Sequence, residues 1–215
     1  MRIKVGTRSS LLALKQVDEI KSRVKNIEFD VVPFETKGDR DKTTPLALVK
    51  GSDFFTYEIE QALIKGEIDI ALHSAKDLGD NMPEGLMLAA MTGSISPFDS
   101  LVALNDLRIE ELPRASRVGT SSSARREAIN RYRPDLIVKD IRGNVDERLK
   151  ELDKGHYDAV IVAHAALIRL RYQKRAYQVL PFSIIEPHPL QGRLAVEIKK
   201  ERKDLAKIFG RIHEK

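Results

Sequence analysis

The 215-residue chain contains no cysteine and no tryptophan, and only 6% of its residues are aromatic. Without cysteine it can form no disulfide, no thiolate metal site, no cysteine nucleophile and no thioether bond to a cofactor. Nucleic-acid binding usually requires basic residues clustered with aromatic side chains that stack on bases. Here the net charge of +5 is spread over a chain in which 32% of the residues are charged, so we expect no nucleic-acid partner.

Long apolar runs are lacking as well. No stretch approaches the roughly 18 residues that a membrane-spanning helix needs. Residues 1–5 alternate charged and apolar side chains and lack the apolar core of a signal peptide. The sequence therefore predicts a cytoplasmic protein without a membrane partner.

Several catalytic motifs are also missing. Neither G-x-G-x-x-G nor G-x-x-x-x-G-K-[ST] occurs, which excludes the common dinucleotide and nucleotide-phosphate fingerprints. The five histidines are scattered without metal-ligand spacing, so no metal site is expected. Ser74 does not lie in the G-x-S-x-G turn of hydrolases.

Short apolar runs alternate with helical periodicity along the whole chain, which predicts an α/β fold with a parallel-type sheet. The nearly continuous apolar run at residues 68–72 is typical of a parallel strand that is covered on both faces. We expect a loop at residues 36–44 and a charged helix near residues 195–213.

Two local similarities suggest that the strand and helix pattern of the first half of the chain is repeated in the second half. V-G-T-R-S-S at residues 5–10 is similar to V-G-T-S-S-S at residues 118–123, and K-G-E-I-D-I-A at residues 65–71 is similar to K-G-H-Y-D-A-V at residues 154–160. One interpretation is that two lobes reuse one strand–turn–helix unit. The other is chance similarity between common α/β junctions.

Clusters of glycine, serine and proline predict the lobe boundaries, with hinges near residues 93–97 and 187–191. The first lobe would then comprise residues 1–92 plus 192–215, and the second residues 98–186. Paired crossings of this kind form a natural hinge. The expected architecture is two α/β lobes with a two-crossing hinge and an inter-lobe cleft.

Both V-G-T turns are candidate anion sites, because a strand that feeds a helix start leaves backbone N–H groups unpaired. Ordinary N-capping by serine and threonine is the alternative interpretation. Arginines favour ligand binding, since guanidinium groups match carboxylates in bidentate geometry. Such arginines follow successive strands and are Arg8, Arg125 with Arg126, Arg142 and Arg148. The pattern predicts a polycarboxylate site in the cleft.

An acid and a base, Asp77 and Lys76, follow the buried strand at residues 68–72. The carboxyl end of a strand is a suitable place for general acid–base chemistry. A surface ion pair is the alternative interpretation.

Taken together, these segments resemble the porphobilinogen deaminase (hydroxymethylbilane synthase) family. The H-S-x-K-D and R-G-N-V elements are the most specific. The matching segments, in family order, are G-T-R-S-S-L-L-A-L at 6–14, T-K-G-D at 36–39, I-A-L-H-S-A-K-D at 70–77, V-G-T-S-S at 118–122, R-P-D-L at 133–136, I-R-G-N-V at 141–145, Y-D-A at 157–159 and Q-G at 191–192.

The resemblance implies a two-lobed fold of the type II periplasmic-binding-protein kind, plus a third, smaller domain. Enzymes of this family join four porphobilinogen units with release of ammonia, on a dipyrromethane cofactor that a cysteine of the third domain holds. By this resemblance Asp77 is the catalytic carboxylate. The residues expected to bind the substrate or cofactor are Arg8, Ser10, Ser74, Lys76, Thr120, Ser121, Arg125, Arg126, Arg142, Arg148 and Gln191.

The sequence also departs from the family pattern. It stops where the third domain is expected to begin, and without cysteine the dipyrromethane cannot be attached covalently. Ungapped alignment puts Ala124 where the first arginine of a pair belongs, whereas a shift by one residue restores the pair as Arg125-Arg126. The other departures are Ser52-Asp53 for Lys-Gly, Phe98 for the Arg before Asp99, and Leu190 for a Gly.

Two functional hypotheses remain open from the sequence. The first is a transferase of tetrapyrrole (haem) biosynthesis that holds its cofactor noncovalently or takes a third domain from a separate chain. The second is a non-catalytic cytoplasmic protein that binds or senses a small organic anion on the same fold.

Overall fold

The structure is a computed structural model that describes residues 1–44, 53–79 and 81–214. Its contacts divide the chain into two compact units. The first unit contains Met1–Asp41, residues 53–79 and 81–95, and the segment from Gly192 onward. The second unit contains Ser96–Gln191 together with residues 42–44. Each unit is described by itself below.

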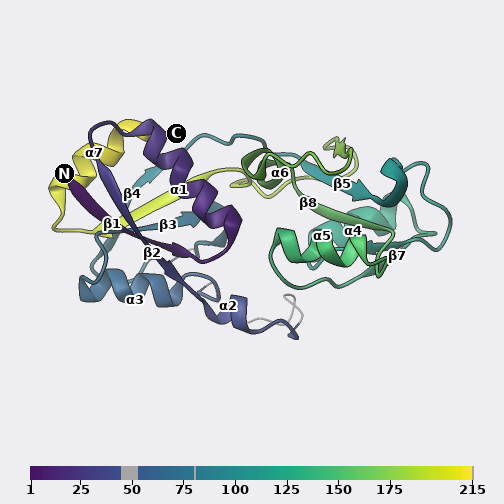
Figure 1. The fold of residues 1–215 in the computed structure, drawn as a ribbon, viewed down its shortest axis with the longest axis horizontal. Coiled ribbons are helices and arrows are strands. Elements are labelled where there is room, and N and C mark those ends of the chain that lie inside the picture. Colours follow the sequence, from purple (N-terminus) through teal and green to yellow (C-terminus); the bar gives the residue numbers. More distant parts are fainter. Residues whose placement is uncertain (45–52, 80, 215) are drawn as a thin grey trace. The chain divides into compact units, whose positions relative to one another are not determined.

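The first unit is a sheet with helices on both faces (Figure 1). Its strands are β1 (Arg2–Arg8), β2 (Glu28–Phe34), β3 (Ile70–Ser74), β4 (Leu86–Met91) and β10 (Leu194–Lys199). Its α-helices are α1 (Leu11–Arg23), α2 (Lys37–Arg40), α3 (Tyr57–Lys65) and α7 (Lys203–Phe209), and its 3-10 helices are η2 (Ala75–Asp77) and η4 (Gly210–Ile212).

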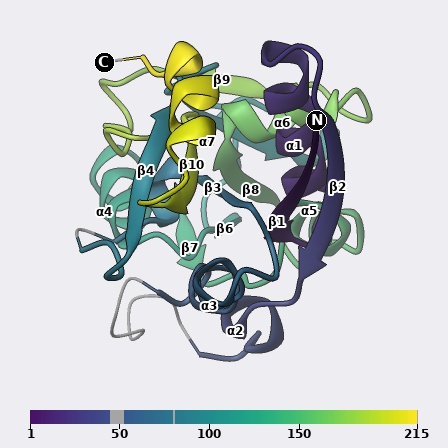
Figure 2. The same ribbon diagram turned by 90° about the vertical axis from the view of Figure 1, so that its left-hand side faces the viewer.

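The strand order in this sheet is β2-β1-β3-β10-β4, which Figure 2 shows from the side of the first unit. β1 runs parallel to β2 and β3, but β10 is antiparallel to both β3 and β4. The sheet is therefore mixed, and the expectation of a parallel-type sheet is wrong for β10.

The segment expected as a charged helix near residues 195–213 begins with the strand β10, and the α-helix occupies only Lys203–Phe209. Tertiary burial explains the difference, because every residue of β10 except Lys199 is buried between its two neighbouring strands and the covering helices. The segment was predicted as a helix because it is rich in charged residues. One of these residues, Glu197, is buried in the strand and does not face solvent.

Two apolar clusters hold the first unit together, one on each face of the sheet. α1 and α7 pack on one face through residues such as Val17, Ile20 and Phe209. α3 packs on the other face through Ile59 and Leu63. Alternate residues of β3 therefore face different helices, since successive side chains of a strand point to opposite faces.

The expected loop at residues 36–44 contains the one-turn helix α2. It begins after Thr36, whose backbone N–H and hydroxyl both donate to Oδ2 of Asp39, at 3.1 and 2.8 Å. This reciprocal capping forms a helical turn that hydrophobic periodicity cannot predict, because the turn is held by polar groups.

The second unit repeats the topology of the first. Its strands are β5 (Asp99–Ala103), β6 (Arg117–Gly119), β7 (Ile137–Lys139), β8 (Ala159–Ala163) and β9 (Gln178–Leu180). Its helices are α4 (Ser123–Tyr132), α5 (Val145–Asp153) and α6 (His164–Leu170), with the 3-10 helix η3 (Leu104–Asp106).

The strand order in the second unit is β7-β6-β8-β5-β9, with β5 antiparallel to its two neighbours. β6, β7 and β8 take the places that β1, β2 and β3 take in the first unit. α4 packs on one face through Ile129, and α5 and α6 pack on the other through Leu149, Leu152 and Leu167. This confirms that the two V-G-T segments begin corresponding strand–turn–helix units.

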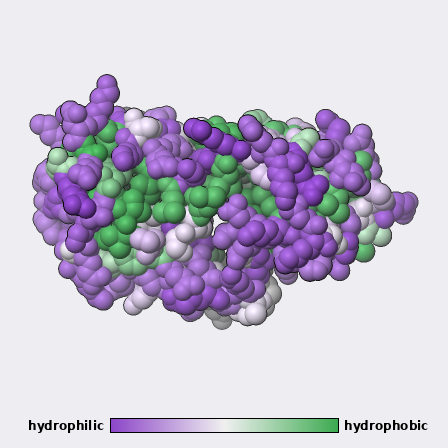
Figure 3. Space-filling view, viewed as in Figure 1, coloured by the Kyte–Doolittle hydropathy of each residue, from purple (hydrophilic) through white to green (hydrophobic). Residues whose placement is uncertain are grey.

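Hydrophilic residues predominate on the face drawn in Figure 3, with hydrophobic residues reaching the surface between them. No helix in the described part of the chain is long and apolar enough to cross a membrane.

Candidate functional site

Arg8, the last residue of β1, is held between a carboxylate and an aromatic ring. Its Nε lies 3.2 Å from each carboxylate oxygen of Asp39, and its Nη2 donates a further hydrogen bond to the same group. Its guanidinium carbon lies 4.4 Å from the centre of the Phe55 ring, a cation–π contact. These contacts fix the orientation of Arg8.

The T-K-G-D segment supplies this support. Burial alone would raise the pKa of Asp39, but hydrogen bonds and charge attraction from Arg8, together with hydrogen bonds from Thr36, lower it below its usual value. A side chain at Gly38 would overlap the Phe55 ring. Glycine at this position therefore lets Phe55 reach the guanidinium.

A pocket of about 30 Å³ opens to solvent beside these groups in the first unit. It lies at the carboxyl ends of β1 and β3, where open α/β sheets bind ligands. It is lined by Thr7, Arg8, Ser10, Leu12, Ala13, Gln16, Phe55, Leu72, His73, Ser74 and Asp77.

Asp77 ends η2 and lines this pocket as a half-buried carboxylate. The turn that carries it is anchored, because the backbone N–H of Ala75 donates to the carbonyl of Arg193 at 3.0 Å. No hydrogen bond or ion pair to the Asp77 carboxylate is present among the residues that the structure describes. The carboxylate is therefore available to a ligand.

Two serines of the pocket have protein partners. Ser10 is the N-cap of α1, and its hydroxyl accepts from the backbone N–H of Ala13 at 3.3 Å. Ser74 accepts from Nε2 of the buried Gln16 at 2.9 Å. The capping interpretation thus accounts for the hydroxyl of Ser10, although the residue also lines the pocket.

The corresponding turn of the second unit is also capped. Ser122 is the N-cap of α4 and accepts from the backbone N–H of Arg125 at 3.4 Å. Thr120 accepts from the backbone N–H of Ser122 at 3.3 Å, and Ser121 donates to the carbonyl of Ile141. These bonds stabilise the turn.

Arg125 and Arg126 both form ion pairs within the second unit. Arg125 makes a bidentate pair with the buried Asp99, with Nε and Nη2 at 2.9 and 2.6 Å from its oxygens. Gln191 joins this pair, because its carbonyl accepts from Arg125 and its amide donates to Asp99. Arg126 donates to Oδ1 of Asp140 at 2.7 Å.

The R-G-N-V segment forms the loop before α5. Gly143 has a φ of 99°, a left-handed conformation that favours glycine. Asn144 and Glu147 form a reciprocal capping box with two hydrogen bonds of 2.9 Å. Arg148 donates from Nε to the carbonyl of Gly143 at 2.9 Å, and Arg142 is half-buried in the same loop.

The predicted residues lie in two groups, one in each unit. In the first unit, the pocket gathers Arg8, Ser10, Ser74 and Asp77; Lys76 is half-buried next to Asp77 in η2 and does not line the pocket. The predicted residues of the second unit are Thr120, Ser121, Arg125, Arg126, Arg142, Arg148 and Gln191. No group of side chains suited to a metal ion occurs in the described residues.

At one position where the chain departs from the family pattern, Phe98 replaces an arginine and makes an aromatic contact. The ring of Phe98 stacks on Phe182 with 4.6 Å between centroids. Asp99, which follows it, holds Arg125 as described above. Ser52 lies outside the described residues.

Sequence reasoning missed Gln16 and Phe55 as pocket residues. Gln16 lies on the buried face of α1, and no pattern distinguishes a buried glutamine from a solvated one. The T-K-G-D match could have indicated Asp39, because such a polar turn near an arginine offers a carboxylate partner.

Comparisons with known proteins agree with this architecture. The structure resembles the probable amino-acid ABC transporter extracellular-binding protein of Bacillus subtilis, with a TM-score of 0.53 and 14% identity over 99% of this chain and 90% of that one. It also resembles the periplasmic VFT2 domain of BvgS from Bordetella pertussis, with a TM-score of 0.50 and 15% identity over 98% and 86%. The fold is thus of the type II periplasmic-binding-protein kind.

A family model described as porphobilinogen deaminase, dipyromethane cofactor binding domain, matches residues 3–207. The chain is 41% identical to porphobilinogen deaminase of Dichelobacter nodosus over 210 residues, which are 96% of this chain and 69% of that protein. It is 40% identical to porphobilinogen deaminase of Deinococcus radiodurans, over 99% of this chain and 71% of that protein. The chain belongs to the porphobilinogen deaminase family.

Proposed function

We propose that this protein binds porphobilinogen, or short chains of pyrroles that carry acetate and propionate groups, and condenses them with release of ammonia. Enzymes of the family are transferases of porphyrin and haem biosynthesis, and membership supports that role here. The pocket of the first unit is the proposed centre of this activity.

The half-buried Asp77 carboxylate, which has no protein partner in the described residues, carries the proposal. A carboxylate can accept a hydrogen bond from a pyrrole N–H and stabilise positive charge on the ring. When the C–N bond of porphobilinogen breaks, ammonia leaves and such a charge develops. Attack by a second pyrrole carbon then forms the C–C bond, and that carbon loses its proton.

The cationic groups of the chain suit the carboxylates of such a ligand. Arg8 lines the pocket in a fixed orientation, with 24% of its side chain exposed. In our proposal Ser10 and Lys76 assist it in the first unit, and Arg142 and Arg148 bind ligand carboxylates in the second. An oriented guanidinium loses little further entropy when it binds a carboxylate.

The residues of the pocket fit the noncovalent part of a dipyrromethane group. Asp77 and Arg8 offer an acceptor for pyrrole N–H groups and a donor for carboxylates. When bound, such a group supplies the pyrrole to which further units are added. This sequence has no cysteine thiol from which a thioether could form, so we propose that these residues hold the group through noncovalent contacts.

The test is an assay of ammonia release from porphobilinogen, with and without preformed dipyrromethane, for the wild type and Asp77→Asn. We expect the substitution to lower the rate at least about 100-fold, because it removes the charge that stabilises the developing cation. The dissociation constant, measured by calorimetry, should change only a few-fold. Native mass spectrometry would show whether dipyrromethane remains bound.

Asp18→Asn is a matched control, because Asp18 is an exposed aspartate on α1 outside the pocket. It should leave both quantities unchanged. If the wild type binds no porphobilinogen even with dipyrromethane present, the proposed function is wrong. Binding without ammonia release would overturn the transferase activity alone.

A further inference from the structure

A cluster of titratable side chains is buried beneath the pocket of the first unit. It consists of Glu60 from α3, His73 from β3 and Glu197 from β10, which are 7%, 5% and 1% exposed. In the sheet register His73 pairs with Ala195 and Glu197 pairs with Ala71, so both side chains point to the α3 face.

The contact between His73 and Glu197 is close but imperfect. Nε2 of His73 lies 3.2 Å from Oε2 of Glu197. The two atoms are not aligned for a hydrogen bond, and neither has another hydrogen-bond partner in the described part of the chain.

Glu60 adds a second carboxylate to this environment. Burial is the main reason why the pKa of Glu60 is raised, and the nearby Glu197 and Asp53 raise it further. A hydrogen bond with Thr56 and the proximity of His73 act in the opposite direction. The proximity of His73 therefore opposes the effect of Glu197 on the pKa of Glu60.

Such a cluster is costly to bury, since apolar side chains of similar volume pack at lower free-energy cost. The cluster is not a metal site, because no group suited to a metal ion occurs in the described residues. His73 also lines the pocket, and it immediately precedes Ser74 and η2. The cluster therefore joins β10 and α3 to the strand end that carries Asp77.

We propose that His73 is a positioning residue, which fixes the turn bearing Asp77 in the pocket through its contact with Glu197. The expected effect of His73 on ligand binding rests on the proposed function. The expected effect of His73 on the position of the turn does not, because it concerns the protein without a ligand.

The experiment compares His73→Gln with Ile198→Val in the full chain. Ile198 is a fully buried residue of β10 on the opposite face of the sheet, so its substitution weakens the same unit without touching the cluster. The first measurement is hydrogen exchange of two turn amides: Ala75, which bonds to the carbonyl of Arg193, and Leu78, which bonds to that of Ala75. The second is the dissociation constant for porphobilinogen.

We expect His73→Gln to speed exchange of both amides roughly tenfold or more relative to Ile198→Val, and to weaken porphobilinogen binding by a similar factor. Glu197→Gln keeps the shape of the side chain and should have the same two effects. It replaces His73→Gln in the experiment if that variant does not fold. Exchange rates in both cluster variants that equal those of Ile198→Val would overturn the inference. If the wild type binds no porphobilinogen, the proposed function fails, and the exchange rates still decide the role of His73.

Discussion

Arg8 and Asp39 show how a ligand-binding cation is prepared by its neighbours. Of their side chains, 24% and 16% are exposed, so solvent screens their attraction only in part. The bidentate geometry and the Phe55 ring hold the guanidinium in one orientation. A free arginine would lose rotamer entropy on binding, whereas this one has already lost it.

We predict that Asp39→Asn lowers the free energy of unfolding by about 2 kcal/mol at pH 7, because it removes charged hydrogen bonds to Arg8. The pKa of Asp39 in the folded protein is lowered from 3.8. Its contribution is therefore present above the unfolded-state pKa and is lost as the pH falls through the folded-state pKa. Urea denaturation at several pH values should show the difference between variant and wild type shrinking below about pH 4. A difference that is constant with pH would contradict this assignment.

At the scale of elements, the sequence predicted the turns before helices and one buried strand, but it did not predict the strand β10. The V-G-T turns and the strand β8 follow from local sequence, because turn residues and apolar runs encode them directly. β10 was misjudged because Glu197 is charged yet buried, and its partner His73 is distant in sequence. For the same reason the polar contacts of Gln16 and Arg125 could not be predicted, since they depend on tertiary neighbours.

The loop before α5 gives a prediction about an element. Gly143→Ala forces an alanine into a φ of 99° and places a Cβ 2.6 Å from the Glu147 carboxylate that caps the helix. We expect the free energy of unfolding to fall by about 2 kcal/mol. Gly155→Ala should cost less, because Gly155 has a φ of 73° but no neighbour within 4 Å. Equal losses for the two variants, measured by urea denaturation, would show that the capping carboxylate is not displaced.

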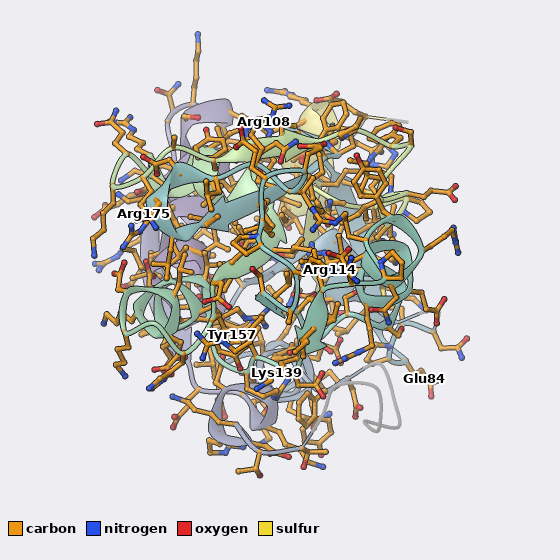
Figure 4. All side chains as sticks on the ribbon, turned by 90° about the vertical axis from the view of Figure 1, so that its right-hand side faces the viewer. Glu84, Arg108, Arg114, Lys139, Tyr157 and Arg175 are labelled. Carbon is orange, nitrogen blue, oxygen red and sulfur yellow. The ribbon has the colours of Figure 1, made fainter. Side chains whose placement is uncertain are left out.

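The surface of the second unit also carries ion pairs that stabilise its helices and loops. Arg175, labelled in Figure 4, donates from Nη2 to Oδ1 of Asp153 at the end of α5, at 2.7 Å. Lys174 binds the other oxygen of the same carboxylate. The two hydrogen bonds lower the pKa of Asp153. Exposed pairs of this kind contribute little stability individually, so we expect each of them to stabilise the second unit only slightly.

At the scale of the whole molecule, the two units differ in how the chain builds them. The strands and helices described in the second unit all come from one continuous segment, Ser96–Gln191, whereas the first unit needs β10 from beyond that segment. Each unit has its own apolar core. We therefore predict that a fragment of residues 96–191 folds alone, with a cooperative thermal transition followed by circular dichroism.

A fragment of residues 1–95 should show no such transition, because β4 pairs only with β10 in the described sheet. Adding a peptide of residues 192–215 should restore it. Cooperative unfolding of residues 1–95 without the peptide would contradict this prediction.

The position of β10 in the sheet has a consequence for synthesis of the protein. A ribosome makes β3 and β4 early, but the strand that lies between them emerges only after the entire second unit. Since chains are made at roughly 5–20 residues per second, the gap in the first sheet persists for several seconds. During that time the unpaired edges of β3 and β4 are exposed to wrong pairing. The sheet that bears Asp77 is thus completed only after the second unit has been made, when β10 fills the place between β3 and β4.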